Sequence, residues 1–201
     1  RPTHFNTSWD MARFEVCAHK WADLSEGDYG VSLLNDCKYG YDIHDSVMRI
    51  TLIKAGVHPQ VSDIEAHAFT YSLYPHAGGW QDGEQENTVR AAYALNVPVY
   101  PVLKTQNSDA HAFRQYLKTD SDHVVVETVK QAEDQNGVIV RLYEYQNKRG
   151  SVRIDFALPV EKVFETDLLE QNPQPIPLKE NAVTFTIKPY EIKTLRVIPR
   201  G

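Results

Sequence analysis

The chain has 201 residues, of which 42% are hydrophobic and 24% are charged, a composition typical of a globular protein. Its formal net charge of −6 disfavours nucleic acid and anionic membrane surfaces as partners, because both bind basic faces. No apolar run approaches the roughly 18 residues that a membrane-spanning helix needs, and the first residue is not Met, so we expect a piece of a longer polypeptide.

The first half of the chain is dominated by alternation of hydrophobic and polar residues, which predicts β-strands. The alternation is clear in "FEVCAHKW" (14–21), "VMRITLI" (47–53) and "AHAFTYSLY" (66–74). In the last segment we expect one apolar face, formed by His67, Phe69, Tyr71 and Leu73. Only "GEQENTVRAAYALN" (83–96) has the composition of a helix, and Pro98 is expected to end it.

The second half repeats the alternation in "HVVVETV", "GVIVRLYEY", "SVRIDFAL", "AVTFTI" and "IKTLRVI". Asn136-Gly137 predicts a tight hairpin turn, because both residues tolerate positive φ. The three prolines in "NPQPIPLKEN" (172–181) predict an extended loop between strands.

Composition changes near residue 120, since all three tryptophans, both cysteines and seven of the eight histidines precede it. The intervening segment, 104–121, is polar and poorly periodic. We therefore predict an all-β protein with two β-sandwich domains, 1–103 and 122–201, joined by a linker over 104–121, and with one short helix in the first domain.

The isolated reactive residues favour structural roles. Cys17 and Cys37 could form one bridge, but free buried thiols in a cytoplasmic protein are the favoured interpretation. The cluster Asp23, Glu26 and Asp28 in "ADLSEGDYG" is interpreted as a solvated turn.

The histidines do not indicate a metal site within the chain, because none shows His-x-x-x-His spacing and no Cys-x-x-Cys motif is present. His67 and His76 bracket a predicted strand and are interpreted as cross-strand polar groups.

The segment "LLNDCKYGYD" (33–42) has the richest side-chain chemistry and two interpretations. Short polar residues at a strand end bond their own backbone, which accounts for Asn35, Asp36 and Gly40. Lys38 and Tyr39 instead suit a loop that contacts a sugar, because a hydroxyl-rich ligand binds acceptors, a cationic donor and flat aromatic faces. Both interpretations remain open at this stage.

Longer motifs in fixed order resemble the C-terminal region of glycoside hydrolase family 38 α-mannosidases, the branch with bacterial and cytosolic or vacuolar enzymes. The first 42 residues, "MRITLIKA", "HAFTYSLYPHAGGW" and "AAYALNVPVYPV" are similar to the family's central β region, a supersandwich domain. "ETVKQAEDQNGVIVRLYEY" and "KPYEIKTLRVI" are similar to its last β-sandwich. The segment "AGVHPQVSDIEA" (55–66) matches the family pattern only in part, so no ligand contact is assigned to it.

The resemblance implies a retaining α-mannosidase that cleaves terminal α-linked mannose from oligosaccharides. It implies that zinc and the carboxylate nucleophile belong to an N-terminal barrel outside this chain, which would be the partner of this region; a homo-oligomer is left open. The fragment alone is expected to be inactive and to bind no metal. On this interpretation "NDCKYG" reaches the mannose pocket: Asn35 and Asp36 would accept hydrogen bonds from sugar hydroxyls, Lys38 would donate, and Tyr39 would form an apolar wall.

Two other interpretations compete with this one. The chain could be an independent carbohydrate-binding β-sandwich, which should display an exposed aromatic platform, so the burial of the three tryptophans discriminates. Alternatively, residues 122–201 merely stabilise an assembly. A surface that faces a catalytic barrel should be apolar, and the candidates for it are Tyr29, Tyr39, Tyr41 and Trp80.

Overall fold

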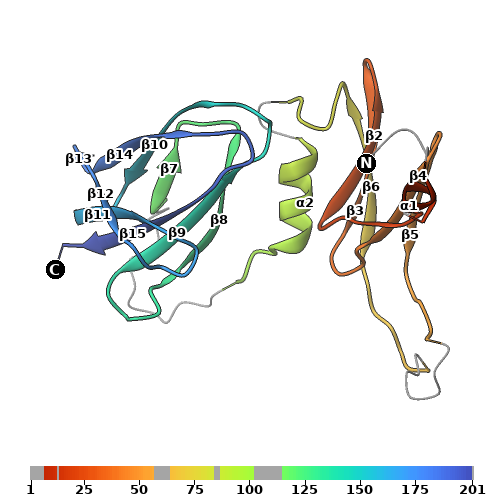
Figure 1. Cartoon of the computed structure of the whole chain (residues 1–201), viewed down its shortest axis with the longest axis horizontal. Coiled ribbons are helices and arrows are strands. Elements are labelled where there is room, and N and C mark those ends of the chain that lie inside the picture. Colours follow the sequence, from red (N-terminus) through yellow and green to blue (C-terminus); the bar gives the residue numbers. More distant parts are fainter. Residues whose placement is uncertain (1–6, 13, 57–63, 84–86, 102–114, 201) are drawn as a thin grey trace. The chain divides into compact units, whose positions relative to one another are not determined.

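The computed structural model describes residues 7–12, 14–56, 64–83, 87–101 and 115–200. The chain divides into two compact units, Arg1–Val102 (unit 1) and Leu103–Gly201 (unit 2) (Figure 1). Across the described residues, no helix is both long and apolar enough to cross a membrane.

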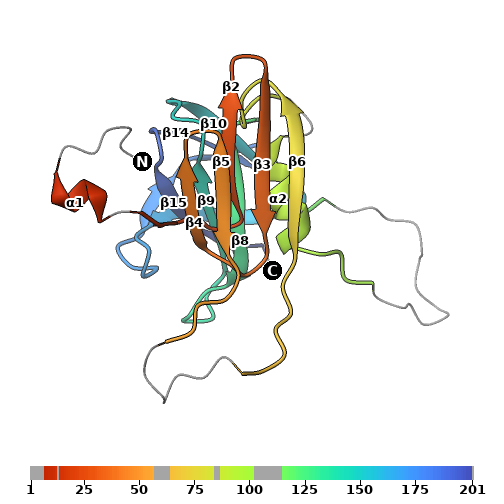
Figure 2. The ribbon, with the colours of Figure 1, turned by 90° about the vertical axis from the view of Figure 1, so that its right-hand side faces the viewer.

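Unit 1 is built from two three-stranded antiparallel sheets and a helix. One sheet has the strand order β1-β4-β5 and the other β2-β3-β6; Figure 2 shows the strands of the second sheet side by side. The elements of unit 1 are α1 (Ser8–Met11), β1 (Val16–Cys17), β2 (Trp21–Glu26), β3 (Tyr29–Asn35), β4 (Gly40–His44), β5 (Val47–Thr51), β6 (Tyr71–Ala77) and α2 (Thr88–Asn96).

The two sheets of unit 1 share a small hydrophobic core. Ala22 and Leu33 from one sheet pack with Tyr41 from the other, and Tyr41 is 0% exposed. Partly buried residues of the β1-β4-β5 sheet, together with Ala18 just after β1, pack against them: Val16, Ala18, Ile43, Met48 and Ile50. Successive side chains of a strand point to opposite faces, so Ser32, next to Leu33, lies on the far face of its sheet.

Helix α2 packs on that far face, where it contacts β2, β3 and β6. The hydroxyl groups of Ser32 and Thr88 lie 2.6 Å apart and hydrogen bond to each other. Asn87 caps the helix, because its side-chain oxygen accepts a hydrogen bond from the backbone N–H of Arg90. The predicted helix thus exists, but it begins at Thr88; residues 84–86 lie outside the described residues. The additional short helix α1 was not predicted.

The expected apolar face of the segment over 66–74 is largely exposed at Tyr71 and Leu73. The strand runs from Tyr71 to Ala77, and Leu73 lies opposite Leu33 in the sheet. Tyr71 and Leu73 are nevertheless exposed, Leu73 to 66%, whereas their neighbours Ser72 and Tyr74 are half-buried. No described residue covers this edge of the face that carries Leu33.

Unit 2 is a sandwich of two antiparallel sheets, with strand orders β13-β14-β10-β7 and β12-β11-β15-β9-β8. Its strands are β7 (Leu117–Thr119), β8 (Val124–Gln131), β9 (Val138–Glu144), β10 (Gly150–Phe156), β11 (Val160–Thr166), β12 (Gln174–Ile176), β13 (Leu178–Lys179), β14 (Ala182–Ile187) and β15 (Ile192–Pro199).

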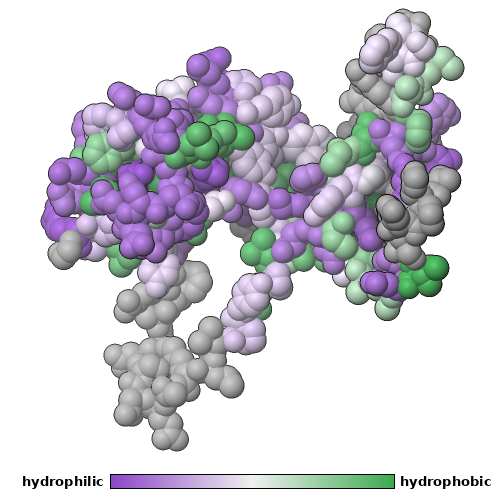
Figure 3. Space-filling view, turned by 60° about the horizontal axis from the view of Figure 1, so that its bottom comes forward, coloured by the Kyte–Doolittle hydropathy of each residue, from purple (hydrophilic) through white to green (hydrophobic). Residues whose placement is uncertain are grey.

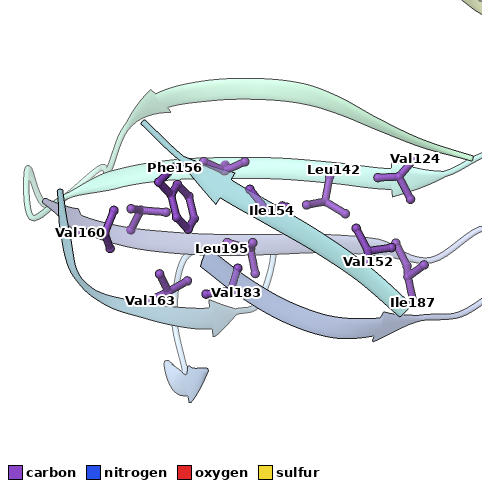
Figure 4. Close-up of a cluster of buried hydrophobic side chains, with 12 residues drawn as sticks. Val124, Leu142, Val152, Ile154, Phe156, Val160, Val163, Val183, Ile187 and Leu195 are labelled. Carbon is purple, nitrogen blue, oxygen red and sulfur yellow. The ribbon is translucent and has the colours of Figure 1, made fainter. Parts of the chain in front are cut away.

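The core of unit 2 lies between its two sheets, as Figure 4 shows. Val152 and Ile154 of β10 and Ile187 of β14 meet Leu142 of β9 and Leu195 of β15, all at most 1% exposed. Alternation along these strands brings one face inward, so the hydrophobic effect on that face holds the sheets together. The face of unit 2 drawn in Figure 3, on the left, is mostly hydrophilic.

The all-β prediction with two sandwich-like parts is confirmed, but three local predictions differ from the structure. Residues 132–137 connect β8 to β9, so Asn136-Gly137 is part of a longer loop in which Gln135 and Gly137 have positive φ. The predicted extended loop over 172–181 contains the short strands β12 and β13. The predicted linker over 104–121 contains β7, which pairs with β10; residues 104–114 lie outside the described residues.

Candidate functional site

The candidate site is the loop of residues 36–39, which connects β3 to β4 and carries most of the "NDCKYG" motif. Asn35 ends β3, where it pairs with Tyr71 of β6, and Gly40 begins β4, where it pairs with Cys17 of β1. The loop therefore crosses from one sheet of unit 1 to the other.

Asn35 is buried, and its hydrogen bonds hold the 36–39 loop in place. Its Nδ2 donates to the Tyr41 hydroxyl at 2.6 Å, and its Oδ1 accepts from the Lys38 backbone N–H at 2.9 Å. Its backbone carbonyl accepts from Nδ2 of Asn96 in α2, also at 2.9 Å. Both amide atoms of this 0% exposed side chain are thus engaged within unit 1.

Asp36 binds the segment that leads into β6. Its Oδ1 accepts from the Thr70 backbone N–H at 2.9 Å, and its own N–H donates to the Thr70 carbonyl. The Thr70 N–H, together with a hydrogen bond from Cys37, lowers the pKa of the Asp36 carboxyl below its usual value. The carboxylate is consequently charged at neutral pH and has acceptor capacity left, because it is only partly buried.

Lys38 and Tyr39 give the loop its cation and its aromatic surface. The Lys38 ammonium lies 5.3 Å from the centre of the Phe69 ring, within the range of a cation–π contact. The exposed Tyr39 ring stacks on His19, with centroids 4.6 Å apart. Of the four predicted site residues, Asp36, Lys38 and Tyr39 are at least partly accessible. Asn35 could contact a sugar only if it first broke its hydrogen bonds within unit 1.

The cysteine prediction is confirmed in part. Cys17 and Cys37 are free, as favoured, but both are exposed rather than buried. The hydrogen bond to Asp36 raises the pKa of the Cys37 thiol. Within the described ranges, there is no group of three or more His, Cys, Asp or Glu side chains that could hold a metal ion.

The interpretation of Asp23 as part of a solvated turn is wrong. Asp23 lies within β2, its side chain is 5% exposed, and its Oδ1 is 2.8 Å from Nε2 of His76 and 2.6 Å from the Ser32 hydroxyl. His76 is a cross-strand polar group, as interpreted. The alternation of side chains along a strand could have placed Asp23 correctly. Asp23 lies two positions after Trp21 and two before Ser25, so all three lie on the face of β2 beneath α2.

The three tryptophans differ in burial. Trp9 is 79% exposed on α1, while Trp21 and Trp80 are half-buried and in contact, with ring centroids 5.1 Å apart. Among the predicted apolar surface residues, Tyr29 and Tyr39 are exposed, but the assignment of Tyr41 is wrong because it is fully buried in the core of unit 1.

Comparison with known families identifies the chain. Residues 1–62 match the glycosyl hydrolases family 38 C-terminal domain, and residues 123–195 match the family 38 C-terminal beta sandwich domain. The two matches together span most of both units. The chain belongs to glycoside hydrolase family 38 and corresponds to the C-terminal part of the family's proteins.

Curated relatives agree with this assignment. The chain is 39% identical to alpha-mannosidase 2C1 of Homo sapiens and 39% identical to alpha-mannosidase G of Dictyostelium discoideum, in each case over 98% of this chain. It is 30% identical to an alpha-mannosidase of Saccharomyces cerevisiae over the same share. The chain spans only about a fifth of the length of these relatives, 19%, 18% and 20% respectively.

A solved structure agrees in fold. An alpha-mannosidase from Enterococcus faecalis V583 matches 98% of this chain with a TM-score of 0.74 and 19% sequence identity, and this chain covers 22% of it. At that identity the likeness concerns the fold alone.

Proposed function

We propose that this chain is the non-catalytic C-terminal β region of a cytoplasmic, retaining, zinc-dependent α-mannosidase that hydrolyses terminal α-linked mannose. Its membership of family 38 and its coverage of about a fifth of the mannosidase relatives support this assignment. In this proposal the catalytic carboxylates and the metal are supplied by a preceding barrel, which packs on this region.

The observation that carries a role in the pocket is the environment of Asp36. Hydrogen bonds from Thr70 and Cys37 lower the pKa of its carboxyl, so the group is ionised and oriented before any sugar arrives. An ionised carboxylate accepts strong hydrogen bonds from hydroxyl donors. Lys38 and Tyr39 flank it with a cation and an aromatic face, which together suit the rim of a sugar pocket.

Retaining hydrolysis needs two carboxyl groups roughly 5–5.5 Å apart on either side of the scissile bond. The 36–39 loop contains only one carboxylate, Asp36, and its neighbours are a thiol, an ammonium and a phenol. The loop is therefore assigned to binding and orienting the sugar, whereas proton transfer and nucleophilic attack are assigned to the barrel.

The experiment is replacement of Asp36 by Asn and by Ala in the longer protein that contains this chain. Loss of one hydrogen bond to a charged acceptor should lower kcat/KM for an aryl α-mannoside by about tenfold to a hundredfold. Asp45→Asn is the matched control, because Asp45 is an exposed carboxylate in the turn between β4 and β5. Unchanged kcat/KM in the Asp36 variants would remove the loop from the site.

A further inference from the structure

The segment that leads into β6 contacts both charged side chains of the 36–39 loop. The backbone of Thr70 forms two hydrogen bonds with Asp36: its N–H donates to the carboxylate, and its carbonyl accepts from the Asp36 N–H. Phe69, the residue before Thr70, places its ring under the Lys38 ammonium, with 5.3 Å from Nζ to the ring centre. Two consecutive residues therefore hold the carboxylate and the cation of the candidate site.

The Lys38 ammonium is held by this ring and not by a carboxylate. Within the described ranges, Lys38 forms no ion pair with an aspartate or a glutamate. An ammonium carries three N–H donors, and a cation–π contact engages only the side that faces the ring. The Lys38 side chain is half-buried, so a ligand can still reach the remaining donors.

The ring also restricts a long, flexible side chain. The Lys38 backbone N–H donates to Oδ1 of Asn35 at 2.9 Å, which fixes the main chain at this position. Immobilising a lysine side chain on binding costs conformational entropy, and less is lost when the side chain is already held. Phe69 can hold it because, among residues 64–70, Phe69 alone is half-buried and the others are exposed. The ammonium is thus oriented before a ligand arrives.

We propose that Phe69 is a positioning residue for the sugar-binding loop: its ring holds the Lys38 ammonium in the orientation in which it donates a hydrogen bond to a substrate hydroxyl. The inference rests on the proposed function, because it requires that the 36–39 loop contacts the sugar. It adds the segment before β6 to the rim of the pocket as a second element. Phe69 acts through Lys38 and makes no sugar contact of its own.

The contact between ring and ammonium is tested in the 201-residue chain by NMR. The ring current of Phe69 should move the resonances of the Lys38 ε-methylene protons upfield, because these protons are next to Nζ, which lies over the ring. Phe69→Leu should return them to the usual position for a solvated lysine, whereas Phe69→Tyr, which keeps a ring, should not. Resonances at the solvated position in the unchanged chain would overturn the inference, whatever the activity of the longer protein.

The effect on activity is tested in the longer protein that contains this chain, with an aryl α-mannoside. Phe69→Leu should lower kcat/KM about threefold to tenfold, the loss expected for one cation–π contact, and Phe69→Tyr should retain most of the activity. In a Lys38→Met background, Phe69→Leu should lower kcat/KM no further, because no ammonium is left to position. Phe164→Leu is the matched control and should leave kcat/KM unchanged, since Phe164 is also half-buried but lies in unit 2.

Unchanged kcat/KM in Phe69→Leu, or an equal loss from Phe69→Leu with and without Lys38, would overturn the inference. An equal loss in Phe69→Tyr would also overturn it, because the effect would then not depend on the aromatic face. Unchanged kcat/KM in Lys38→Met would contradict the proposed function of the loop and this inference together. A loss in Lys38→Met without one in Phe69→Leu would contradict this inference alone, so the two failures are distinguishable.

Discussion

Asn35 and Asp36 are chemically similar neighbours with opposite environments. Asn35 ends β3 inside unit 1, where Tyr41, Lys38 and Asn96 use its polar atoms. Asp36 is one step further along the chain, partly exposed, and joined to Thr70. The buried amide fixes the geometry of the loop, and the carboxylate beside it is left able to bind a ligand.

Replacement of Asn35 by Ala is therefore expected to destabilise unit 1. It removes the hydrogen bonds to the Tyr41 hydroxyl and to the Lys38 N–H, and it leaves the half-buried Lys38 N–H without its acceptor. The free energy of unfolding should fall by about 2–3 kcal/mol, measured by urea denaturation. Tyr39→Phe is the control, since the Tyr39 ring is exposed; equal stability of the two variants would contradict the structural role of Asn35.

The residue types of the loop were predictable from the sequence, but their burial was not. Composition alone marked 35–39 as a segment with acceptors, a cation and an aromatic residue. The backbone carbonyl of Asn35 accepts a hydrogen bond from Asn96, which lies 61 positions later and is brought close by the packing of α2. The role of Asp23 was likewise misjudged, because its contact with His76 joins residues 53 positions apart.

At the scale of elements, Glu144 organises the end of β9. This 1% exposed carboxylate accepts hydrogen bonds from the backbone N–H groups of Gln146, Asn147, Lys148 and Tyr190. Burial raises the pKa of Glu144, but the four N–H donors outweigh burial and hold the pKa below its ordinary value. The charged form of Glu144 thus closes two turns of unit 2.

The lowered pKa of Glu144 determines the direction in which the free energy of unfolding changes with pH. A depressed folded-state pKa contributes stability above the unfolded pKa of about 4.5, and that contribution is lost as the pH falls through the folded pKa. Glu144→Gln should lower the free energy of unfolding by about 1–3 kcal/mol at pH 7. The free energy of unfolding of the variant should also fall less than that of the unchanged chain as the pH is lowered. Urea denaturation between pH 7 and pH 3 measures both effects. If the free energy of unfolding of the variant fell with pH as steeply as that of the unchanged chain, the stabilising role of ionised Glu144 would be contradicted.

Strands were predictable where the alternation of hydrophobic and polar residues is regular, and were missed where it breaks. β14 occupies the same residues, 182–187, as the predicted segment. β11 was missed, because a bulge between Val160 and Lys162 shifts the inward-facing positions out of period two. Period two identified the apolar face of β6 but not its exposure, since periodicity does not decide which side a neighbouring sheet or helix will cover.

At the scale of the whole molecule, unit 1 exposes hydrophobic surface on a sheet that is otherwise packed. Tyr71 and Leu73 lie on the face of β6 shared with the core residue Leu33, yet both are exposed. Exposed hydrophobic side chains grouped in this way mark contact surfaces. In the proposed function, further parts of the longer mannosidase would pack on Tyr71 and Leu73. The relatives have such further parts, because this chain spans only about a fifth of their length.

The division of labour between this region and a catalytic barrel is tested most directly by mannose release. The purified 201-residue chain and the longer protein that contains it are incubated in parallel with an aryl α-mannoside, and liberated mannose is measured. We expect release by the longer protein and none above the blank by the chain alone. Turnover by the chain alone would contradict the account, because it would place the catalytic groups within these two β units.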